Sequence, residues 1–357
     1  MPERVVRLAD EVSSLTRARL KEVSGVASST KILAINASIE AARAGAAGAG
    51  FAIVAREVGT VADTVRSLST QLDEQLAPLV EELSTLGASL VEQVRGTRLA
   101  DLALNAVELI DRNLYERSCD VRWWATDSAM VEACVAGAGT DEARHASRRL
   151  GVILSSYTVY LDLWVADRDG RVIAHGRPGR FGSVRGADVS REPWFARAVA
   201  TTSGAEYVVD DVSTNHLLGV ATVATYATAI RAGGEEDGEV LGALGIFFDF
   251  APQAHDIVTG VRVADADRDV TRVLLVDASH RVLASSDGAG VLSEHIDLAP
   301  MGSTEVGSFT RRDGEVVGFA RTPGYETYEG LGWYGVIVQR PRRKASPSER
   351  GPRTLAR

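Results

Sequence analysis

Several residues in the C-terminal half have the chemistry to bind a small charged molecule. Such a ligand needs a cationic group, an aromatic wall and an opposing acid around an apolar cavity. Arg191 can hold a carboxylate through two parallel hydrogen bonds. Trp194 and Phe195 can form the wall, and Asp249 ends an apolar run where it can receive an ammonium group. Three further side chains can orient polar atoms of the ligand: Tyr207, Asp210 and Tyr226. For each of these residues, a structural role in a capped turn or a core stands as an equal alternative.

The sequence contains no arrangement typical of catalysis. No two of its six histidines stand four positions apart, and none neighbours a cysteine, so the spacing of a zinc or iron site is missing. There is no G-x-S-x-G elbow. The glycines Gly45, Gly48 and Gly50 lack the preceding strand and the lysine of a phosphate-binding loop. We therefore expect no enzyme activity, no metal and no cofactor.

Composition and charge limit the classes of partner and location. The 357 residues, 45% of them hydrophobic, predict about two domains with a sizeable core. A net charge of −9 argues against nucleic acid or an anionic membrane surface as the main partner. The longest stretch without charged residues or histidine, Leu217 to Ile230, has 14 residues, fewer than the roughly 20 of a membrane span. With two cysteines, Cys119 and Cys134, read as reduced thiols, we expect a cytoplasmic protein without a membrane span.

The N-terminal third is predicted to be an antiparallel helical hairpin. Apolar residues recur at helical spacing, and the break is the glycine-rich segment 44–50, whose glycines would each cost roughly 1 kcal/mol inside a helix. After the turn, steps of four and three predict a coiled-coil seam of Val54, Val58, Val61, Val65, Leu68 and Leu72. The opposing stripe is expected to contain Ser28, Ile32, Ile35 and Ile39. A single hairpin leaves outer apolar positions wet, so we expect a homodimer that forms a four-helix bundle.

The rest of the chain is predicted to contain two copies of one α+β subdomain. Short β-branched runs alternate with turn residues from about Leu150 onward. The segment Asp167–Ala174, a turn followed by a strand, aligns with Asp277–Ala284 after an interval of 110 residues. A chance match between two common hairpin patterns is the alternative. We expect the first copy over 155–260 and the second over 261–340.

The glycine-rich turn and its flanks resemble the hairpin tip of bacterial methyl-accepting chemotaxis proteins over about residues 20–70. The similarity lies in the segment Ile35–Gly45, in Gly48, and in Gly50–Ala55 with Glu57 and Val58. In that family the tip contacts a histidine kinase and a coupling adaptor, and receptor dimers join there into trimers. The resemblance implies polar trimer contacts by Glu40 and Arg43. It implies docking and packing by Ile32, Ile35, Asn36, Ile39, Phe51 and Val54.

The tip also departs from the family pattern. Apex positions that usually carry polar or charged residues are alanines, as at Ala46 and Ala47, and Arg56 replaces an acid. The arm before the turn is also too short to hold the family's first methylation sites. These departures favour an alternative function as a non-catalytic oligomeric scaffold, or a ligand-binding protein that no longer couples to the kinase.

Residues 118–340 resemble the double Cache sensor module, which has two PAS-like subdomains behind a long helix. The similarity lies in Asp188–Phe195, Gly242–Asp249 and the segments Tyr325–Tyr328 and Gly330–Trp333. In that family the first subdomain binds amino acids, carboxylates, amines or purines. The resemblance implies a hairpin and stalk over 1–115, a connecting long helix over 116–154 and the two subdomains. The basic, proline-containing segment 341–357 is expected to be a disordered tail. The adjacent Trp123 and Trp124 predict a packed junction between stalk and sensor.

The expected fold is therefore α+β, a long helical hairpin followed by a double Cache domain. The expected function is that of a cytoplasmic chemoreceptor-like signal transduction protein.

Overall fold

A computed structural model describes residues 2–299 and 302–342, and the chain separates into two compact units, Met1–Arg95 and Gly96–Arg357. The basic tail predicted over 341–357 falls outside the described residues from position 343 onward. The fold class predicted from the sequence, α+β with a helical hairpin and two antiparallel sheets, is confirmed.

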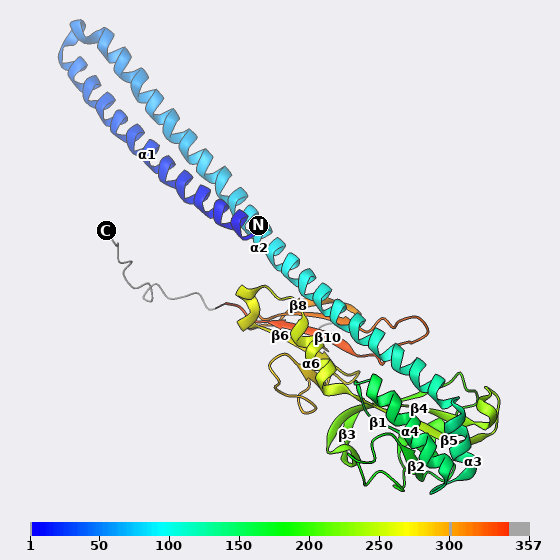
Figure 1. Ribbon diagram of the computed structural model, residues 1–357. Helices are drawn as coiled ribbons and strands as arrows, with labels where there is room; N and C mark the ends of the chain where they lie inside the picture. Colours follow the sequence, from blue (N-terminus) through cyan, green and yellow to red (C-terminus); the bar gives the residue numbers. More distant parts are fainter. Residues whose placement is uncertain (1, 300–301, 343–357) are drawn as a thin grey trace, which may run out of the picture. The chain divides into compact units, whose positions relative to one another are not determined.

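The first unit is an antiparallel helical hairpin (Figure 1). Helix α1 (Pro2–Arg43) is followed by the short 3-10 helix η1 (Gly45–Gly48) and by α2 (Ala49–Ala125), whose first half belongs to this unit. Helix α2 continues through Pro78. Polar contacts cross the hairpin at two places. Arg66 Nη2 donates to Ser28 Oγ at 3.2 Å, and Lys31 forms an ion pair with Asp63 and donates to Gly59 O at 3.4 Å.

The seam inside the hairpin differs from the predicted one. Six buried residues are small and stand seven positions apart along their helix: Ala27, Ala34 and Ala41 on α1, and Ala55, Ala62 and Ser69 on α2. Small side chains at a heptad spacing let the two helix backbones approach closely. Most aliphatic residues of the predicted seam are exposed instead, with Val54 and Val61 each 60% exposed and Leu68 53% exposed, while Val65 is half-buried. The opposing stripe is exposed as well, at Ile32, Ile35 and Ile39.

The second unit begins with three helices in place of the single connecting helix predicted over 116–154. Helix α2 ends at Ala125 and is followed by α3 (Ser128–Ala136) and α4 (Asp141–Ser156). The Asp127 side chain accepts a hydrogen bond from the Ala129 amide, and Thr140 Oγ1 accepts from the Ala143 amide. These N-caps satisfy amide groups that have no partner inside a helix, and so they set where the new helices begin.

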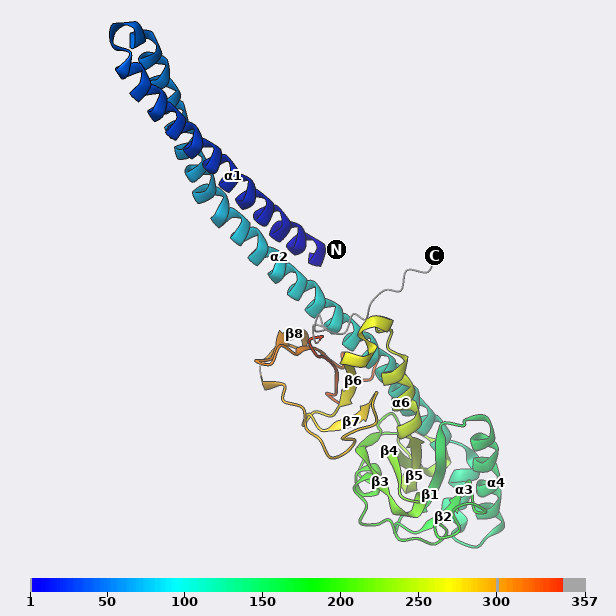
Figure 2. The same cartoon turned by 90° about the vertical axis from the view of Figure 1, so that its left-hand side faces the viewer.

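Two five-stranded antiparallel sheets follow, and each has the same strand order. Figure 2 shows both sheets. The first sheet, in the order β2-β1-β5-β4-β3, contains β1 (Tyr160–Asp167), β2 (Val172–His175), β3 (Val208–Asn215), β4 (Ala221–Arg231) and β5 (Val240–Asp249). The second, in the order β7-β6-β10-β9-β8, contains β6 (Thr271–Val276), β7 (Val282–Ser285), β8 (Val306–Thr310), β9 (Val316–Arg321) and β10 (Tyr334–Gln339). Helix α6 (Phe250–Gly260) and η4 (Asp265–Val270) connect them, while α5 (Pro193–Val199), η2 (His216–Leu218) and η3 (Ala232–Gly234) lie between strands of the first sheet.

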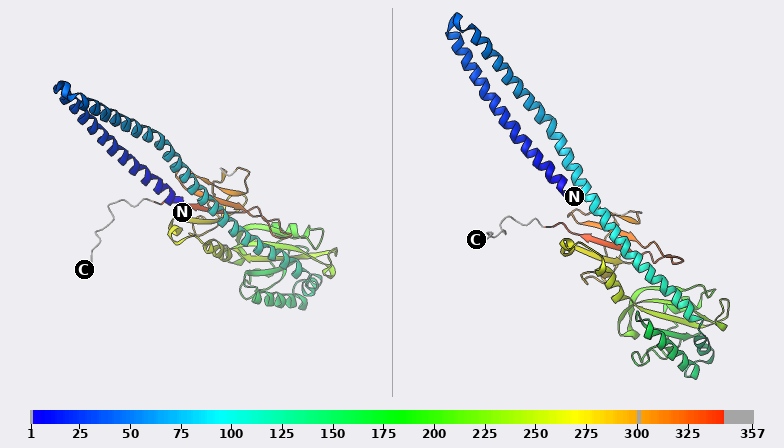
Figure 3. Two further views of the ribbon diagram at one scale, coloured as in Figure 1. Left: turned by 90° about the horizontal axis from the view of Figure 1, so that it is seen from above. Right: turned by 45° about the horizontal axis from the view of Figure 1, so that its top comes forward.

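One hydrophobic core joins the C-terminal part of α2 to both sheets. It contains residues from α2, the first sheet, α6 and the second sheet: Val107, Ile110, Leu114, Tyr226, Phe248, Phe250, Leu275 and Ile337. Figure 3 shows this part of α2 running alongside the two sheets. The second sheet touches the α2 backbone because two of its strands carry glycine at the contact. A Cβ atom at Gly318 would lie 2.4 Å from the Leu99 carbonyl carbon, and one at Gly335 2.5 Å from Ala103 O.

Of the two tryptophans predicted to pack at the junction, Trp124 is packed and Trp123 is not. Trp124 is buried, and its ring packs edge to face against Tyr157 and Tyr160 at centroid distances of 5.2 and 5.5 Å. Trp123 is 70% exposed.

Candidate ligand site

A cleft of about 620 Å³ opens at one end of the first sheet. We call it the sensor cleft. It lies where β5 ends, beside η2 and the loop that follows β2. Its wall contains three groups able to carry charge, Arg180, His216 and Asp249, and an apolar set of Leu161, Phe181, Leu217, Leu218 and Ala221, with Gly182, Ser183 and Gly219.

Local hydrogen bonds fix the segments that line the sensor cleft. Asn215 Oδ1 accepts from the amides of Leu217 and Leu218 at 3.0 and 3.2 Å, so the end of β3 turns directly into η2. The Asp249 amide donates to Val159 O at 2.8 Å, which holds the point where β5 passes into α6. The Arg180 guanidinium carbon lies 4.9 Å from the centroid of the Phe181 ring, so the ring supports the cation.

The electrostatics of the sensor cleft suit a ligand that carries a positive charge, a negative charge or both. Burial raises the pKa of the Asp249 carboxyl above its ordinary value, and the guanidinium groups of Arg180 and Arg177 oppose that rise. A half-buried carboxylate of this kind gains most when an ammonium group replaces its lost water. Arg180, which lines the same cleft, can hold a carboxylate.

The apolar lining of the sensor cleft packs on an aromatic core on the same face of the sheet. Leu161, Phe181 and Leu218 belong to a cluster that also contains Trp164, Trp194 and Phe247. The Trp164 and Phe247 ring centroids are 4.0 Å apart, and the Trp194 and Phe247 centroids are 5.8 Å apart with perpendicular planes. This packing gives the cleft a rigid apolar base.

Of the seven predicted ligand residues, the structure places Asp249 in the wall of the sensor cleft. Trp194 and Phe195, in α5, are buried in the aromatic core of the same face. Arg191 lies exposed just before α5. Asp210 forms an ion pair with Arg197, on the last turn of α5.

The two predicted tyrosines lie on the opposite face of the sheet. Tyr226 and Tyr207 pack in the core shared with α2, whereas Ala227, the next residue of β4, belongs to the cluster under the cleft. Successive side chains of a strand alternate between faces, so Tyr226 and Trp194 cannot share one pocket. The structure therefore does not bring the seven residues together.

Sequence reasoning missed Arg180, Phe181 and His216. They lie in loops and in η2, where no periodic pattern marks a residue as facing a cavity. The usable signals were local: Asn215 as a cap before His216, and Pro178-Gly179 as a turn before Arg180.

The hairpin tip presents all eight residues for which the sequence implies partner contacts. Phe51 is 76% exposed, and Ile32, Ile35, Asn36, Ile39 and Val54 are also exposed. Glu40 and Arg43 form an exposed ion pair at 2.7 Å within α1. A groove of about 580 Å³ lies beside them, between α1 and α2, and half of its lining residues are alanines; Leu33, Phe51, Val54 and Val58 also line it.

Comparisons with known proteins agree with this division into a hairpin and a sensor unit. Residues 4–114 match the family model of the methyl-accepting chemotaxis protein (MCP) signalling domain. The methyl-accepting chemotaxis protein NahY of Pseudomonas putida is 38% identical over 117 residues, which are 31% of this chain and 21% of NahY. McpN of Pseudomonas aeruginosa is 41% identical over 78 residues, 22% of this chain and 14% of McpN. The chain thus spans about a fifth or less of the length of these relatives.

The fold of the second unit also has a solved counterpart. The second unit is similar in fold to the sensor domain of the histidine kinase DctB from V. cholerae. The match covers 67% of this chain and 94% of the DctB domain, with a TM-score of 0.50 and 14% sequence identity. Among the helices of the described residues, none combines the length and the apolar character that a membrane span requires. The chain joins a hairpin similar to MCP signalling domains to a unit with the double Cache sensor fold.

Proposed function

We propose that this chain is a chemoreceptor-like signal transduction protein in which a small molecule bound at the sensor cleft alters the helical hairpin. The observation that carries the proposal is α2, a single helix over Ala49–Ala125 that forms one arm of the hairpin and also packs in the core of the sensor unit. A helix that belongs to both parts can carry a small displacement from one to the other.

Contacts inside the sensor unit support a route from the cleft to α2. Strand β3 ends in η2, which lines the cleft, and its irregular stretch at Asp211 and Val212 reaches the second sheet. There the Arg281 Nη2 donates to Val212 O at 3.2 Å and lies 3.7 Å from the Asp211 carboxylate. The second sheet in turn packs on α2 at Gly318 and Gly335. A shift of η2 can therefore change the packing of α2.

The ligand class that fits the sensor cleft best is a small zwitterion or other charged metabolite. Asp249 can hold an amine while Arg180 holds a carboxylate, above the apolar floor around Phe181. An amino acid carries both groups on one small molecule. Simple carboxylates, amines and purines stay within the proposal, because each can use part of the same set.

The hairpin tip is the proposed partner surface. Exposed Phe51, Ile35 and Ile39 beside an apolar groove suit a protein partner. We propose that the tip contacts a chemotaxis histidine kinase and its coupling adaptor. The exposed Val61 and Leu68 pack against a second copy of the chain, which forms a four-helix homodimer. Such dimers can join into trimers of dimers. The proposed location is the cytoplasm, which the free Cys119 and Cys134 fit.

The proposed boundaries are a hairpin and stalk over 1–115, a connecting region over 116–154 and sensor subdomains over 155–260 and 261–340. The proposal assigns no catalytic step to either part. It requires ligand binding in one unit and protein contact in the other.

Thermal unfolding of the full chain tests the sensor cleft. Amino acids, carboxylates, amines and purines are screened one at a time, and a true ligand raises the unfolding midpoint in proportion to the logarithm of its concentration. The variants Asp249→Asn and Arg180→Ala should lose most of that rise, whereas Asp169→Asn, in an exposed turn, should keep it. If no compound raises the midpoint, or if the two cleft variants respond fully, the cleft assignment fails.

Co-purification with a chemotaxis adaptor and kinase tests the tip. Wild-type chain should retain both, and Phe51→Ala or Glu40→Ala should reduce retention, because these residues are exposed at the tip. Glu74→Ala, exposed on α2 away from the groove, is the matched control. Retention of neither partner by the wild-type chain, together with ligand binding at the cleft, would favour the uncoupled scaffold instead.

A further inference from the structure

Four buried polar side chains from three segments meet at the α2 face of the sensor core. Asp111 comes from α2, Tyr226 from β4, and Thr322 and Tyr328 from the segment between β9 and β10. We call these four residues the junction cluster. All four are buried, and Asp111 and Tyr226 have no exposed surface.

The junction cluster holds polar atoms that lack a protein partner. Asp111 Oδ2 accepts a hydrogen bond from the Gly324 amide at 2.7 Å, but Asp111 Oδ1 has no donor among the described residues. The Thr322 hydroxyl is also without a partner there, and the neighbouring Tyr226 and Tyr328 hydroxyls interact with each other but form no hydrogen bond of good geometry. A Cβ built at Gly330 would lie 3.0 Å from Thr322 Oγ1 and 3.5 Å from Asp111 Oδ1, so these two oxygens face the same small space. Unpaired buried groups of this kind are costly to the folded state.

Electrostatics favour a proton at this carboxyl. Burial raises the pKa of Asp111 to about 6, a rise that the Gly324 amide opposes and the negative charge of Glu108 adds to. Burial also raises the pKa of both Tyr226 and Tyr328 above the ordinary tyrosine value, so they stay neutral.

The charged side chains nearest to the junction cluster are exposed to solvent and lie outside it. On α2, Glu108 and Arg112 are exposed, and the Arg112 guanidinium lies 5.2 Å over the Tyr325 ring. On the facing segment, Glu326 and Glu329 are exposed as well. Tyr226 is the titratable group that β4 contributes. Among these described neighbours, none forms an ion pair with Asp111, so its charge is not neutralised by a nearby cation.

We propose that the junction cluster is a proton-binding site, which gives the sensor unit a response to pH that is separate from the sensor cleft. A protonated Asp111 donates from Oδ1 to a hydroxyl oxygen of the cluster while Oδ2 still accepts from Gly324. A charged Asp111 leaves a buried carboxylate with no cation beside it in the described part of the chain. The contact between α2 and the segment 322–330 therefore tightens when the proton binds. This inference does not depend on a cleft ligand, and variants of Asp249 leave it intact.

Unfolding in urea across a range of pH tests the proton site in the full chain. The folded chain holds the Asp111 proton more tightly than the unfolded chain, so wild type loses stability as pH rises. Relative to Asp111→Asn, its unfolding constant should rise about tenfold for each pH unit between about 4 and 6, and level off above about pH 7. Asn keeps the shape and the acceptor for Gly324. Asp101→Asn, exposed on the same helix, should run parallel to wild type. Parallel curves for Asp111→Asn and wild type would overturn the proposal.

A second measurement needs no variant. The sequence contains two Pro-Gly pairs, Pro178-Gly179 and Pro323-Gly324, so ¹³C-carbonyl proline with ¹⁵N-glycine selects two amide resonances. The Gly324 amide donates to Asp111 and should move with a midpoint near pH 6. Gly179 lies in an exposed loop and serves as the internal control. A Gly324 resonance that shows no inflection between about pH 5 and 7 overturns the proposal.

Discussion

The two sheets of the sensor unit have the same strand order but carry side chains of opposite charge at one equivalent position. In each, the first strand pairs with the second through the same register and the same bulge: Trp164 faces His175 in the first sheet, and Leu274 faces Ser285 in the second. The alignment that matches Asp167 with Asp277 places Asp162 at the position of Arg272. One position thus carries a buried anion in the first sheet and a cation in the second.

The anion in the first sheet organises the loop that leads to the sensor cleft. Asp162, with no exposed surface, accepts from His175 Nδ1 at 2.8 Å and Trp164 Nε1 at 3.1 Å. It also accepts from the amides of Gly176 and Arg177 at 3.0 and 3.1 Å. These bonds fix the chain a few residues before Arg180 and Phe181, which line the cleft.

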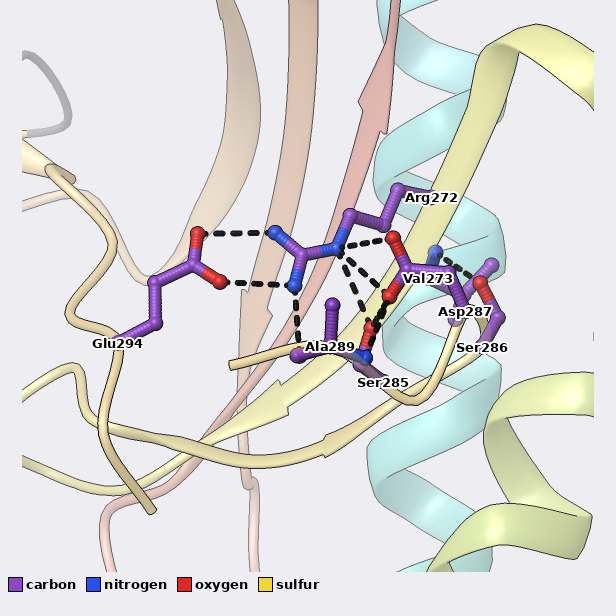
Figure 4. Close-up of polar contacts among 7 residues, drawn as sticks. All are labelled: Arg272, Val273, Ser285, Ser286, Asp287, Ala289 and Glu294. Carbon is purple, nitrogen blue, oxygen red and sulfur yellow. Dashed lines mark hydrogen bonds and ion pairs between the residues drawn. The ribbon is translucent and has the colours of Figure 1, made fainter. Parts of the chain in front are cut away.

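The cation in the second sheet closes the corresponding loop (Figure 4). Arg272 donates two bonds of 2.8 Å to the Glu294 carboxylate and contacts Asp287 at 3.0 Å. It also donates to Ser285 Oγ at 3.2 Å and to Ala289 O at 2.8 Å. Both carboxylates, Asp287 and Glu294, belong to the loop that follows β7, so their ion pairs with Arg272 hold this loop against the sheet. The same sheet position therefore lies beside an open cleft in the first sheet and beside a closed loop in the second.

The largest expected effect comes from removing the buried anion. Asp162→Asn leaves donors from Trp164 and His175 facing an amide in a fully buried site, and should lower the free energy of unfolding by about 3–5 kcal/mol. Urea unfolding of the full chain measures it. Asp169→Asn, in the exposed turn of the same hairpin, should change stability by less than about 0.5 kcal/mol. A small loss at Asp162 would mean that this carboxylate does not anchor the loop.

Removing the cation of the second sheet should cost less. The carboxylates that Arg272 binds remain partly exposed, 37% for the Glu294 side chain and 48% for Asp287, so water can replace the lost bonds. We expect Arg272→Met to lower the free energy of unfolding by about 1.5–3 kcal/mol. The control is Arg268→Met, whose ion pair with Asp265 is exposed and should contribute almost nothing. Equal losses from the two variants would contradict the special role of Arg272.

The Arg272 effect should also depend on pH. Hydrogen bonds from Arg272 lower the pKa of the Glu294 carboxyl below its ordinary value. The folded chain therefore binds this proton less readily than the unfolded chain, and the stabilisation is present above about pH 4.3. As pH falls through the lowered pKa, the difference between wild type and Arg272→Met should shrink. A difference that stays constant down to about pH 3 would show that charge at Glu294 plays no part.

The contact of each sheet with α2 offers a third comparison. By the shared register, Gly335 corresponds to Leu244 in the first sheet, where a large side chain fits. Gly335→Ala places a Cβ 2.5 Å from Ala103 O and should cost about 1–3 kcal/mol. Gly179→Ala, with open space around its Cβ position, should not destabilise the chain. If Gly335→Ala and Gly179→Ala have the same free energy of unfolding, the second sheet does not pack closely on the α2 backbone.

The smallest expected effect is a slight gain in stability from Asp249→Asn. Burial raises the pKa of Asp249, so its charged form destabilises the folded chain at neutral pH, and Asp249→Asn should raise the unfolding midpoint slightly. The gain should vanish in acid, where the unfolded carboxyl is also protonated. The same variant should lose the ligand response, which separates binding from stability. A loss of stability at neutral pH would show that Arg177 and Arg180 already outweigh the burial.

The sequence made the repeat and the hairpin predictable because both depend on local patterns. The glycine-rich segment 44–50 could not continue a helix, and Asp167–Ala174 repeated a turn and strand that any sheet must place together. The seam of the hairpin was misjudged for a physical reason. Valine and leucine were assigned to the seam, yet alanines such as Ala34 and Ala62 allow closer helices and leave the larger residues for an outer contact.

The sensor cleft was less predictable because it depends on which sheet face a residue occupies. Asp249 could be found, since it ends an apolar run. Tyr226 and Trp194 were grouped by residue type, but the strand alternation that separates them needs the exact strand register. Arg180 and His216 lie in loops, whose course is set by tertiary contacts such as those of Asp162.

Hydrogen–deuterium exchange of the full chain tests the central claim, that α2 links the cleft to the hairpin. Exchange is compared with and without a saturating amount of the metabolite that most raises the unfolding midpoint. Altered protection is expected both around η2 and along α2 between Leu99 and Leu114, extending into its hairpin half. Protection that changes around the cleft alone, with α2 unaffected, would contradict transmission through this helix.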